Sequence, residues 1–214
     1  IVRGCGSLEA TAALGRQLAG LLRPGDVVAL EGDLGAGKTT LVRSVVAGLG
    51  LDASMVSSPT FVIANDYPGS ADAPPVVHVD AYRLGGADEL DTIGWDRVLD
   101  GPAVVFVEWQ SRIAAAMPDG HAEVRIRQAG ETSRRFEFEI PAGWLDRPGL
   151  LQLAQQPETR EPTVCPVTGV LVAGDCPTWP FADERARMAD LYRWMHESYT
   201  ITREIKVADL EQGD

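Results

Sequence analysis

Apolar positions near the start of the chain follow a helical period and then a strand pattern. The helical period starts after Ser7 and stops at Pro24-Gly25; its apolar positions are Leu8, Ala12, Leu14, Leu18, Leu21 and Leu22. This spacing predicts one amphipathic helix. Residues 27–30 then form a continuous apolar run between Gly25-Asp26 and Gly32. Such a run is typical of a buried strand in a parallel sheet.

Short apolar runs continue through the first two-thirds of the chain. A glycine-rich turn and a helix at about 38–49 come first, and the runs that follow are 61–64, 76–79, 103–107, 124–126 and 136–140. Strands that alternate with helical segments predict an α/β fold around a mostly parallel central sheet. The last two runs are close together and alternate in polarity, so we expect an antiparallel hairpin at the end of the sheet.

The pattern changes after residue 140. Residues 141–162 contain four prolines and three glutamines without a sustained period, and we interpret them as a linker between a domain at 1–140 and a second unit at 163–214. The clearest element of that unit is a helix at 183–199, with apolar positions at Met188, Leu191, Tyr192 and Met195. A unit of about 50 residues is close to the size at which a core needs help from metal, disulfide or docking.

Composition excludes several classes of protein. The chain carries 31 acidic and 19 basic residues, a net charge of −12, which disfavours broad phosphate binding, so any nucleic-acid role should be local or indirect. The three cysteines, Cys5, Cys165 and Cys176, form no Cys-x-x-Cys pair, which argues against a disulfide framework and favours a reducing cytoplasm. No apolar run is long enough to span a bilayer, so we expect no membrane association.

A phosphate-binding motif lies between the first predicted strand and its helix. Residues 32–39 match Gly-x4-Gly-Lys-Ser/Thr, the P-loop. Its glycines turn backbone N–H groups into one concavity, Lys38 brings a charge to the terminal phosphates, and the Thr39 hydroxyl can ligate Mg²⁺. The alternative, a glycine-rich turn with a solvated lysine, does not explain the strand and helix around it. We therefore predict ATP and Mg²⁺ as ligands, with nucleotide contacts from Gly35, Ala36, Gly37, Lys38, Thr39 and Thr40.

Two later apolar runs each end in a carboxylate, Asp80 and Glu108. Beside a P-loop, such strand-end acids hold Mg²⁺ or orient the attacking water, whereas a lone acid at this position can simply end a strand. We predict that Lys38, Asp80 and Glu108 are catalytic, and interpret His78 as structural. Hydroxyls at Ser58 and Thr60 suit a switch that senses the γ-phosphate, although a plain turn remains open.

Taken together, these segments resemble the TsaE family. The matching stretches are 32–40, 58–61, 78–84, 89–94 and 108–109, in the order and spacing of that family, and they cover about residues 5–140. The resemblance implies an ATPase that works with TsaB and TsaD in making threonylcarbamoyladenosine in tRNA. It implies contact with tRNA only through that complex.

The resemblance also assigns roles to individual residues. It implies that Thr39 and Glu108 hold Mg²⁺ and that Asp80 positions water or supports catalysis. For Trp109 it implies nucleotide contact, and a core aromatic at a strand end remains an alternative. It places two further residues, Thr11 and Arg135, near the nucleotide.

Other classes of nucleotide protein fit less well. The sequence has no Asn-Lys-x-Asp guanine signature, and no arginine-rich lid follows the P-loop as a small-molecule kinase would need. ATP hydrolysis is therefore the expected activity. The alternative is a nucleotide-binding scaffold or regulator with little hydrolysis, whose C-terminal unit docks a partner.

Three stretches of the C-terminal unit, 165–168, 180–186 and 189–201, resemble the YacG family of small zinc proteins that bind and inhibit DNA gyrase. That family has cysteines at the four positions occupied here by Cys165, Thr168, Ala182 and Ala186. One thiolate cannot build a closed zinc site, so we expect a unit that keeps the shape without zinc. We expect its core to contain the helix stripe with Trp179, Phe181 and Trp194, and to dock on the first domain. Gyrase binding is an analogy only.

Overall fold

The computed structural model describes residues 1–59, 63–155, 160 and 162–195, without the side chains of Trp194 and Met195. Its main elements are β1 (Val2–Cys5), α1 (Leu8–Ala19), β2 (Val27–Glu31), α2 (Lys38–Gly48), β3 (Ala64–Tyr67), β4 (Val76–Asp80), α3 (Trp95–Leu99), β5 (Val104–Glu108), β6 (Ala122–Gln128), β7 (Arg134–Glu139), α4 (Leu150–Ala154), β8 (Thr163–Val164), β9 (Leu171–Val172) and α5 (Glu184–Met195). Short 3₁₀ helices at Ala53–Met55, Ala81–Arg83, Ala87–Ile93, Gln110–Ala116 and Ala142–Trp144 connect some of them.

A seven-stranded sheet forms the centre of the larger domain. Its order is β1-β7-β6-β2-β5-β4-β3. The strands β6, β2, β5 and β4 are parallel, and antiparallel pairs stand at both edges, β6–β7–β1 on one side and β4–β3 on the other. The predicted α/β fold with a mostly parallel sheet and an antiparallel hairpin is confirmed.

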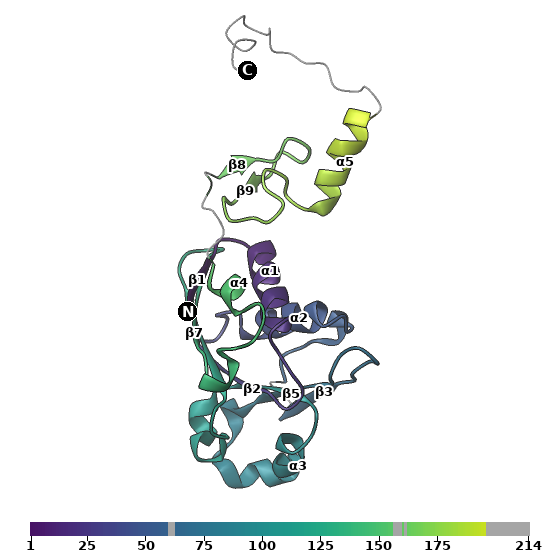
Figure 1. Cartoon of the computed structure of the whole chain (residues 1–214). Helices are drawn as coiled ribbons and strands as arrows, with labels where there is room; N and C mark the ends of the chain where they lie inside the picture. Colours follow the sequence, from purple (N-terminus) through teal and green to yellow (C-terminus); the bar gives the residue numbers. More distant parts are fainter. Residues whose placement is uncertain (60–62, 156–159, 161, 196–214) are drawn as a thin grey trace, which may run out of the picture.

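Each face of the sheet carries its own hydrophobic cluster. Helices α1, α2 and α4 pack with Val28, Leu30 and Phe106 on one face (Figure 1). The 3₁₀ segments at 81–83, 87–93 and 110–116 pack with α3, Val105 and Val107 on the other. Successive residues of a strand point to opposite faces, which explains why the parallel strands are apolar throughout. It also places every second residue of β4 and β5 beneath α2.

Helices α1 and α2 lie very close together because small residues occupy their contact. A Cβ on Gly15 of α1 would collide with Ser44 of α2, and a Cβ on Gly48 would lie 2.8 Å from that of Ala19. Leu14, Leu18, Leu41 and Val45 are fully or almost fully buried around this contact. The close packing fixes the position of α2, whose first turn follows the P-loop.

The sequence pattern gave no indication of β1. This strand pairs antiparallel with β7, where Val2 lies opposite Glu137. It carries Arg3, which is only 4% exposed and donates to the Leu153 carbonyl at 2.6 Å and to Gln17 Oε1 at 3.0 Å. A segment of four residues that includes a charged side chain is too short and too polar for periodicity to reveal a strand.

Much of the predicted linker packs against the larger domain. Trp144 is 3% exposed and Leu153 is fully buried, and both belong to the cluster beneath α1. Arg147 pairs with Asp26, with its Nη2 2.8 Å from Oδ1, and its guanidinium lies over the Trp144 ring. Residues 142–154 are therefore part of this domain. They are held by isolated side chains, Trp144, Arg147 and Leu153, whose spacing gives no helical or strand period in the sequence.

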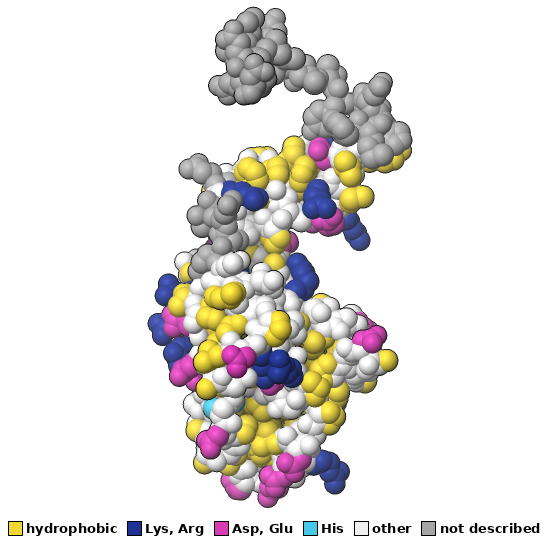
Figure 2. Space-filling view, viewed as in Figure 1, with side chains coloured by type: hydrophobic (Ala, Val, Ile, Leu, Met, Phe, Trp, Pro, Cys, Tyr) yellow, Lys and Arg dark blue, Asp and Glu magenta, His cyan; other side chains and the backbone are white. Residues whose placement is uncertain are grey.

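The small C-terminal unit contains the β8–β9 pair and α5, and it lies at one end of the larger domain, beyond α1 (Figure 1 and Figure 2). Its buried core consists of Cys165, Val172, Cys176 and Ala186, with Trp179 and Phe181 packed against it. The expectation that the helix stripe joins this core is wrong for its described members: Met188, Leu191 and Tyr192 are 53%, 45% and 64% exposed. Ala186 faces inward, so Met188, two residues later, points to the opposite side.

Helix α5 spans most of the helix predicted at 183–199, and residues 196–199 lie outside the described part. Over the ranges that the structure describes, no helix has the length and apolar character needed to cross a membrane.

Candidate active site

The P-loop connects β2 to α2 through glycines in unusual conformations. Gly32 has a φ of 151°, and a Cβ at this position would lie 2.5 Å from the Ile126 carbonyl oxygen. Gly37 caps α2 with a φ of 111°, and no side chain caps this helix. The first N–H groups of α2 therefore remain directed toward the loop, where the helix dipole favours an anion.

Lys38 lies folded against this loop and is 5% exposed. Its Nζ donates to the carbonyls of Gly32 at 2.8 Å and Asp33 at 3.2 Å. The same ammonium lies 3.8 Å from Glu108 Oε2 and 4.3 Å from the centroid of the Trp109 ring. A buried cation is thus held between a carboxylate and an aromatic face.

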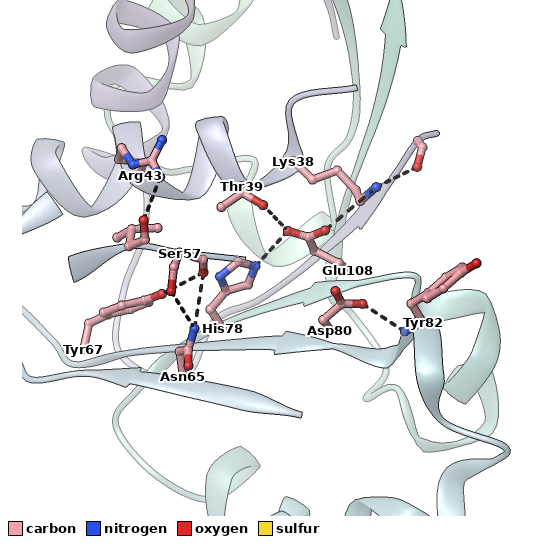
Figure 3. A network of polar contacts seen from close by, with 12 residues as sticks. Lys38, Thr39, Arg43, Ser57, Asn65, Tyr67, His78, Asp80, Tyr82 and Glu108 are labelled. Atoms are coloured by element: carbon pink, nitrogen blue, oxygen red, sulfur yellow. Dashed lines mark hydrogen bonds and ion pairs between the residues drawn. The ribbon is translucent and has the colours of Figure 1, made fainter. Parts of the chain in front are cut away.

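Glu108 is the centre of the polar network (Figure 3). It ends β5 directly opposite Asp80 of β4 and is 3% exposed. Its Oε1 accepts the Thr39 hydroxyl at 3.0 Å and lies 2.9 Å from Nε2 of His78. A hydroxyl and a carboxylate oxygen are ligands that Mg²⁺ prefers, so Thr39 and Glu108 fit the predicted metal site.

Asp80 lies beside this network and caps the 3₁₀ turn that follows β4. It is 8% exposed, and its Oδ1 accepts the backbone N–H of Tyr82 at 3.0 Å. Burial raises the pKa of the Asp80 carboxyl, and the Glu108 charge raises it further, against lowering contributions from the Tyr82 N–H, His78 and Lys38. The group is therefore a stronger proton acceptor than an ordinary aspartate.

Trp109 follows Glu108 in a left-handed conformation, with a φ of 60°. It is the only non-glycine residue with positive φ in the described ranges, and such strain gathers at functional sites. Its ring packs against Tyr82, with centroids 5.2 Å apart and a tilt of 52°. The side chain also packs partly on the core, as the alternative of a core aromatic expects, and nucleotide contact stays a prediction.

These side chains line a pocket of about 520 Å³. Its residues are Leu34, Gly35, Gly37, Lys38, Thr39, Thr40, Ser58, Asp80, Tyr82, Glu108 and Trp109. The segment before Ser58 is held in place by bonds to the Ser57 carbonyl from Asn65 Nδ2 at 3.2 Å and from the Tyr67 hydroxyl at 3.4 Å. The other predicted switch residue, Thr60, lies outside the described residues.

A second pocket, of about 730 Å³, lies on the other side of the P-loop and shares Gly35, Gly37 and Thr40 with the first. Thr11 lines it, with its hydroxyl donating to the Ser7 carbonyl at 3.1 Å. The structure thus places Thr11 beside the P-loop but separates it from the acids.

The structure does not bring Arg135 to either of these two pockets. Its Nε donates to Glu137 at 2.9 Å on the exposed face of β7. The preceding residue, Arg134, faces the P-loop, and its Nε donates to the Ala36 carbonyl at 3.0 Å. Alternation along β7 puts Arg134 on the same side as Phe136, which lines the second pocket.

Sequence reasoning interpreted His78 as structural and did not single out Arg134. Residues two apart on a strand share a face, so His78 could have been placed on the same side as Asp80. For Arg134 the useful signal was its spacing from the buried Phe136. Tyr82, which contacts both Asp80 and Trp109, had no distinguishing pattern because it follows the end of a strand.

Comparison with known proteins gives a consistent result. The family model described as threonylcarbamoyl adenosine biosynthesis protein TsaE matches residues 5–136. A Streptomyces coelicolor protein named tRNA threonylcarbamoyladenosine biosynthesis protein TsaE is 49% identical over 136 residues, 63% of this chain and 90% of that protein. A Bacillus subtilis protein of the same name is 38% identical over 130 residues, 61% of this chain and 79% of that protein.

A solved structure agrees with the sequence relatives. The crystal structure of Bacillus subtilis YdiB superimposes with a TM-score of 0.54 at 31% sequence identity, covering 67% of this chain and 86% of that one. The match to the family model includes the P-loop, Asp80, Glu108 and Arg134 and ends before the small unit. The chain belongs to the TsaE family.

Proposed function

We propose that this chain hydrolyses ATP with Mg²⁺ as a component of tRNA threonylcarbamoyladenosine biosynthesis. The observation that carries the proposal is the meeting of Thr39, Lys38 and Glu108 at one end of a P-loop pocket, with 3.0 Å between the Thr39 hydroxyl and Glu108 Oε1. Phosphoryl transfer requires a cation, a metal-binding acid and a water-positioning group at such a point. The names of the relatives support the pathway.

The two pockets suggest how ATP lies in the site. The terminal phosphates belong beside Lys38 and Glu108, where the charged groups gather. The nucleoside then lies on the opposite side of the loop, in the pocket lined by Thr11, Thr40 and Phe136. Gly35 and Gly37 line both pockets, so the phosphate chain passes along their backbone.

Each polar side chain has a distinct task in this arrangement. Lys38 exchanges its bonds to the Gly32 and Asp33 carbonyls for phosphate oxygens. Thr39 and Glu108 would hold Mg²⁺, which would supply the positive charge that neutralises the phosphates, and His78 orients the Glu108 carboxylate from the other side. Asp80 positions the attacking water, a task that its raised pKa favours.

The pathway assignment implies protein partners. We infer that the chain acts with TsaB and TsaD and reaches tRNA only through them. A net charge of −12 supports indirect contact, because an acidic surface repels the phosphate backbone. A nucleotide-binding scaffold with little hydrolysis is the competing function, and it predicts binding without turnover.

The test measures ATP binding, ATP turnover and tRNA modification by the full chain, alone and with TsaB and TsaD from the same organism. We expect Mg²⁺-dependent turnover and tRNA modification with the partners present, and loss of ATP binding in Lys38→Ala. The control is Arg127→Ala, which removes a cation from the hairpin away from the P-loop pocket. ATP binding without turnover in any combination would favour the scaffold, and wild-type binding by Lys38→Ala would contradict the proposal.

A further inference from the structure

We propose that the C-terminal unit supplies one wall of the nucleoside pocket and thereby contributes to nucleotide affinity. This inference rests on the proposed function, and it assigns a role to residues that lie beyond the family match at 5–136. The pocket of about 730 Å³ is lined from four directions: the start of α1, the P-loop, the β6–β7 hairpin and the segment 162–173. Pro162, Leu171 and Ala173 come from this last segment.

Gly6, just before α1, connects with two other parts around the pocket, the small unit and the β6–β7 hairpin. It lies between β1 and Ser7, the residue that caps α1. Its N–H donates to the carboxylate of Asp175 in the small unit, and its carbonyl accepts the Thr132 hydroxyl of the hairpin at 3.0 Å. A carboxylate close to the N-terminus of α1 is also favoured by the helix dipole.

The wall from the C-terminal unit consists of Pro162, Leu171 and Ala173, so it suits an uncharged, flat group rather than phosphate, whereas the charged lining residues Glu9, Glu131 and Arg134 come from the larger domain. Leu171 and Leu8, both lining the pocket, are 71% and 70% exposed, so each presents apolar surface at the pocket. Phe136, which is fully buried in the core, is among the other lining residues. Apolar side chains around a few polar groups are typical of sites that hold a heterocyclic ring. The chemical class expected here is therefore a purine base of a nucleoside di- or triphosphate.

The geometry separates this wall from the phosphate site. Leu171 and Asp175 do not line the pocket that holds Lys38, Thr39 and Glu108. Loss of the wall should therefore weaken contacts to the base while leaving contacts to the phosphates. A ligand with phosphates and no base distinguishes the two effects.

The experiment compares the full-length wild type with Leu171→Ala and Asp175→Ala, using calorimetric titration with ATP, ADP and inorganic triphosphate. The matched control is Val170→Ala, because Val170 is 56% exposed on the same unit and does not line the pocket. We expect Leu171→Ala and Asp175→Ala to weaken ATP and ADP binding about tenfold. Triphosphate binding should stay at the wild-type value in all variants, as should ATP binding by Val170→Ala.

Two results would overturn this inference and leave the proposed function standing. One is wild-type ATP affinity in both variants, and the other is an equal loss of triphosphate and ATP affinity. Leu171→Ala alters an exposed side chain, so its result stands even where Asp175→Ala disturbs the small unit. Wild-type chain that binds neither ATP nor triphosphate would instead overturn the proposed function, and this inference with it.

Discussion

His78 Nε2 lies 2.9 Å from Glu108 Oε1, and neither side chain is more than 4% exposed. The two residues come from neighbouring parallel strands and meet on the face that α2 covers. The same Oε1 also accepts the Thr39 hydroxyl. His78 therefore fixes the orientation of the acid that the proposed metal site needs.

Removing this support should weaken metal binding more than nucleotide binding. Residues that orient a metal ligand typically contribute about 10–100-fold in affinity or activity. We expect His78→Ala to raise the Mg²⁺ concentration for half-maximal turnover by about tenfold. His121→Ala is the control, since His121 contacts the Pro118 carbonyl away from the pocket. Unchanged Mg²⁺ dependence in His78→Ala would show that the histidine only fills the core.

The raised pKa of Asp80 predicts a pH-dependent stability difference. Burial raises the pKa of the Asp80 carboxyl above its value in the unfolded chain, and the Glu108 charge raises it further. The folded state therefore binds the proton more tightly. The stability that this tighter proton binding gives to the folded state is fully present below the pKa of the unfolded chain, and it is lost as pH rises through the pKa of the folded state. Asp80→Asn, which keeps an acceptor for the Tyr82 N–H, should therefore gain melting temperature relative to wild type between pH 4 and pH 7. A difference that is constant with pH would contradict this account.

Sequence patterns predicted the part of the fold that depends on continuous apolar runs. The parallel strands, the P-loop and the carboxylates at 80 and 108 were correctly placed because these features are local. The role of His78 and the position of Arg134 depend on which neighbours a strand face meets, so a single chain segment does not reveal them. The packing of 142–154 depends on isolated anchors such as Trp144.

The anchors in that segment give a direct stability test. Leu153 is fully buried against α1, whereas Leu151, on the same short helix, is 79% exposed. Leu153→Ala should lower the free energy of unfolding by about 2–5 kcal/mol, because it leaves a cavity. Leu151→Ala should change it by less than about 0.5 kcal/mol. Urea denaturation of the full chain measures both, and equal effects would mean that the segment is a linker.

We also expect the small unit to fold without zinc. Burial raises the pKa of the Cys165 thiol, but hydrogen bonds from the Thr168 side chain and from the backbone N–H groups of Thr168, Ala182 and Val167 outweigh it and bring the pKa to about 7. Protein hydrogen-bond donors thus already contact the Cys165 thiol. Metal analysis of untagged protein should find no stoichiometric zinc, and chelator should leave the melting temperature unchanged. One tightly bound zinc per chain would refute this expectation.

The central claim is that Glu108 is the acid on which Mg²⁺-dependent ATP hydrolysis depends, and the most direct measurement is the turnover of Glu108→Gln. The matched control is Glu137→Gln, on the outer face of β7, where Glu137 pairs with Arg135. With TsaB and TsaD present, the turnover rate of Glu108→Gln should be about 10²–10³-fold lower than that of the wild type, while the variant still binds ATP. Glu137→Gln should keep the wild-type rate. Wild-type turnover by Glu108→Gln would contradict the account.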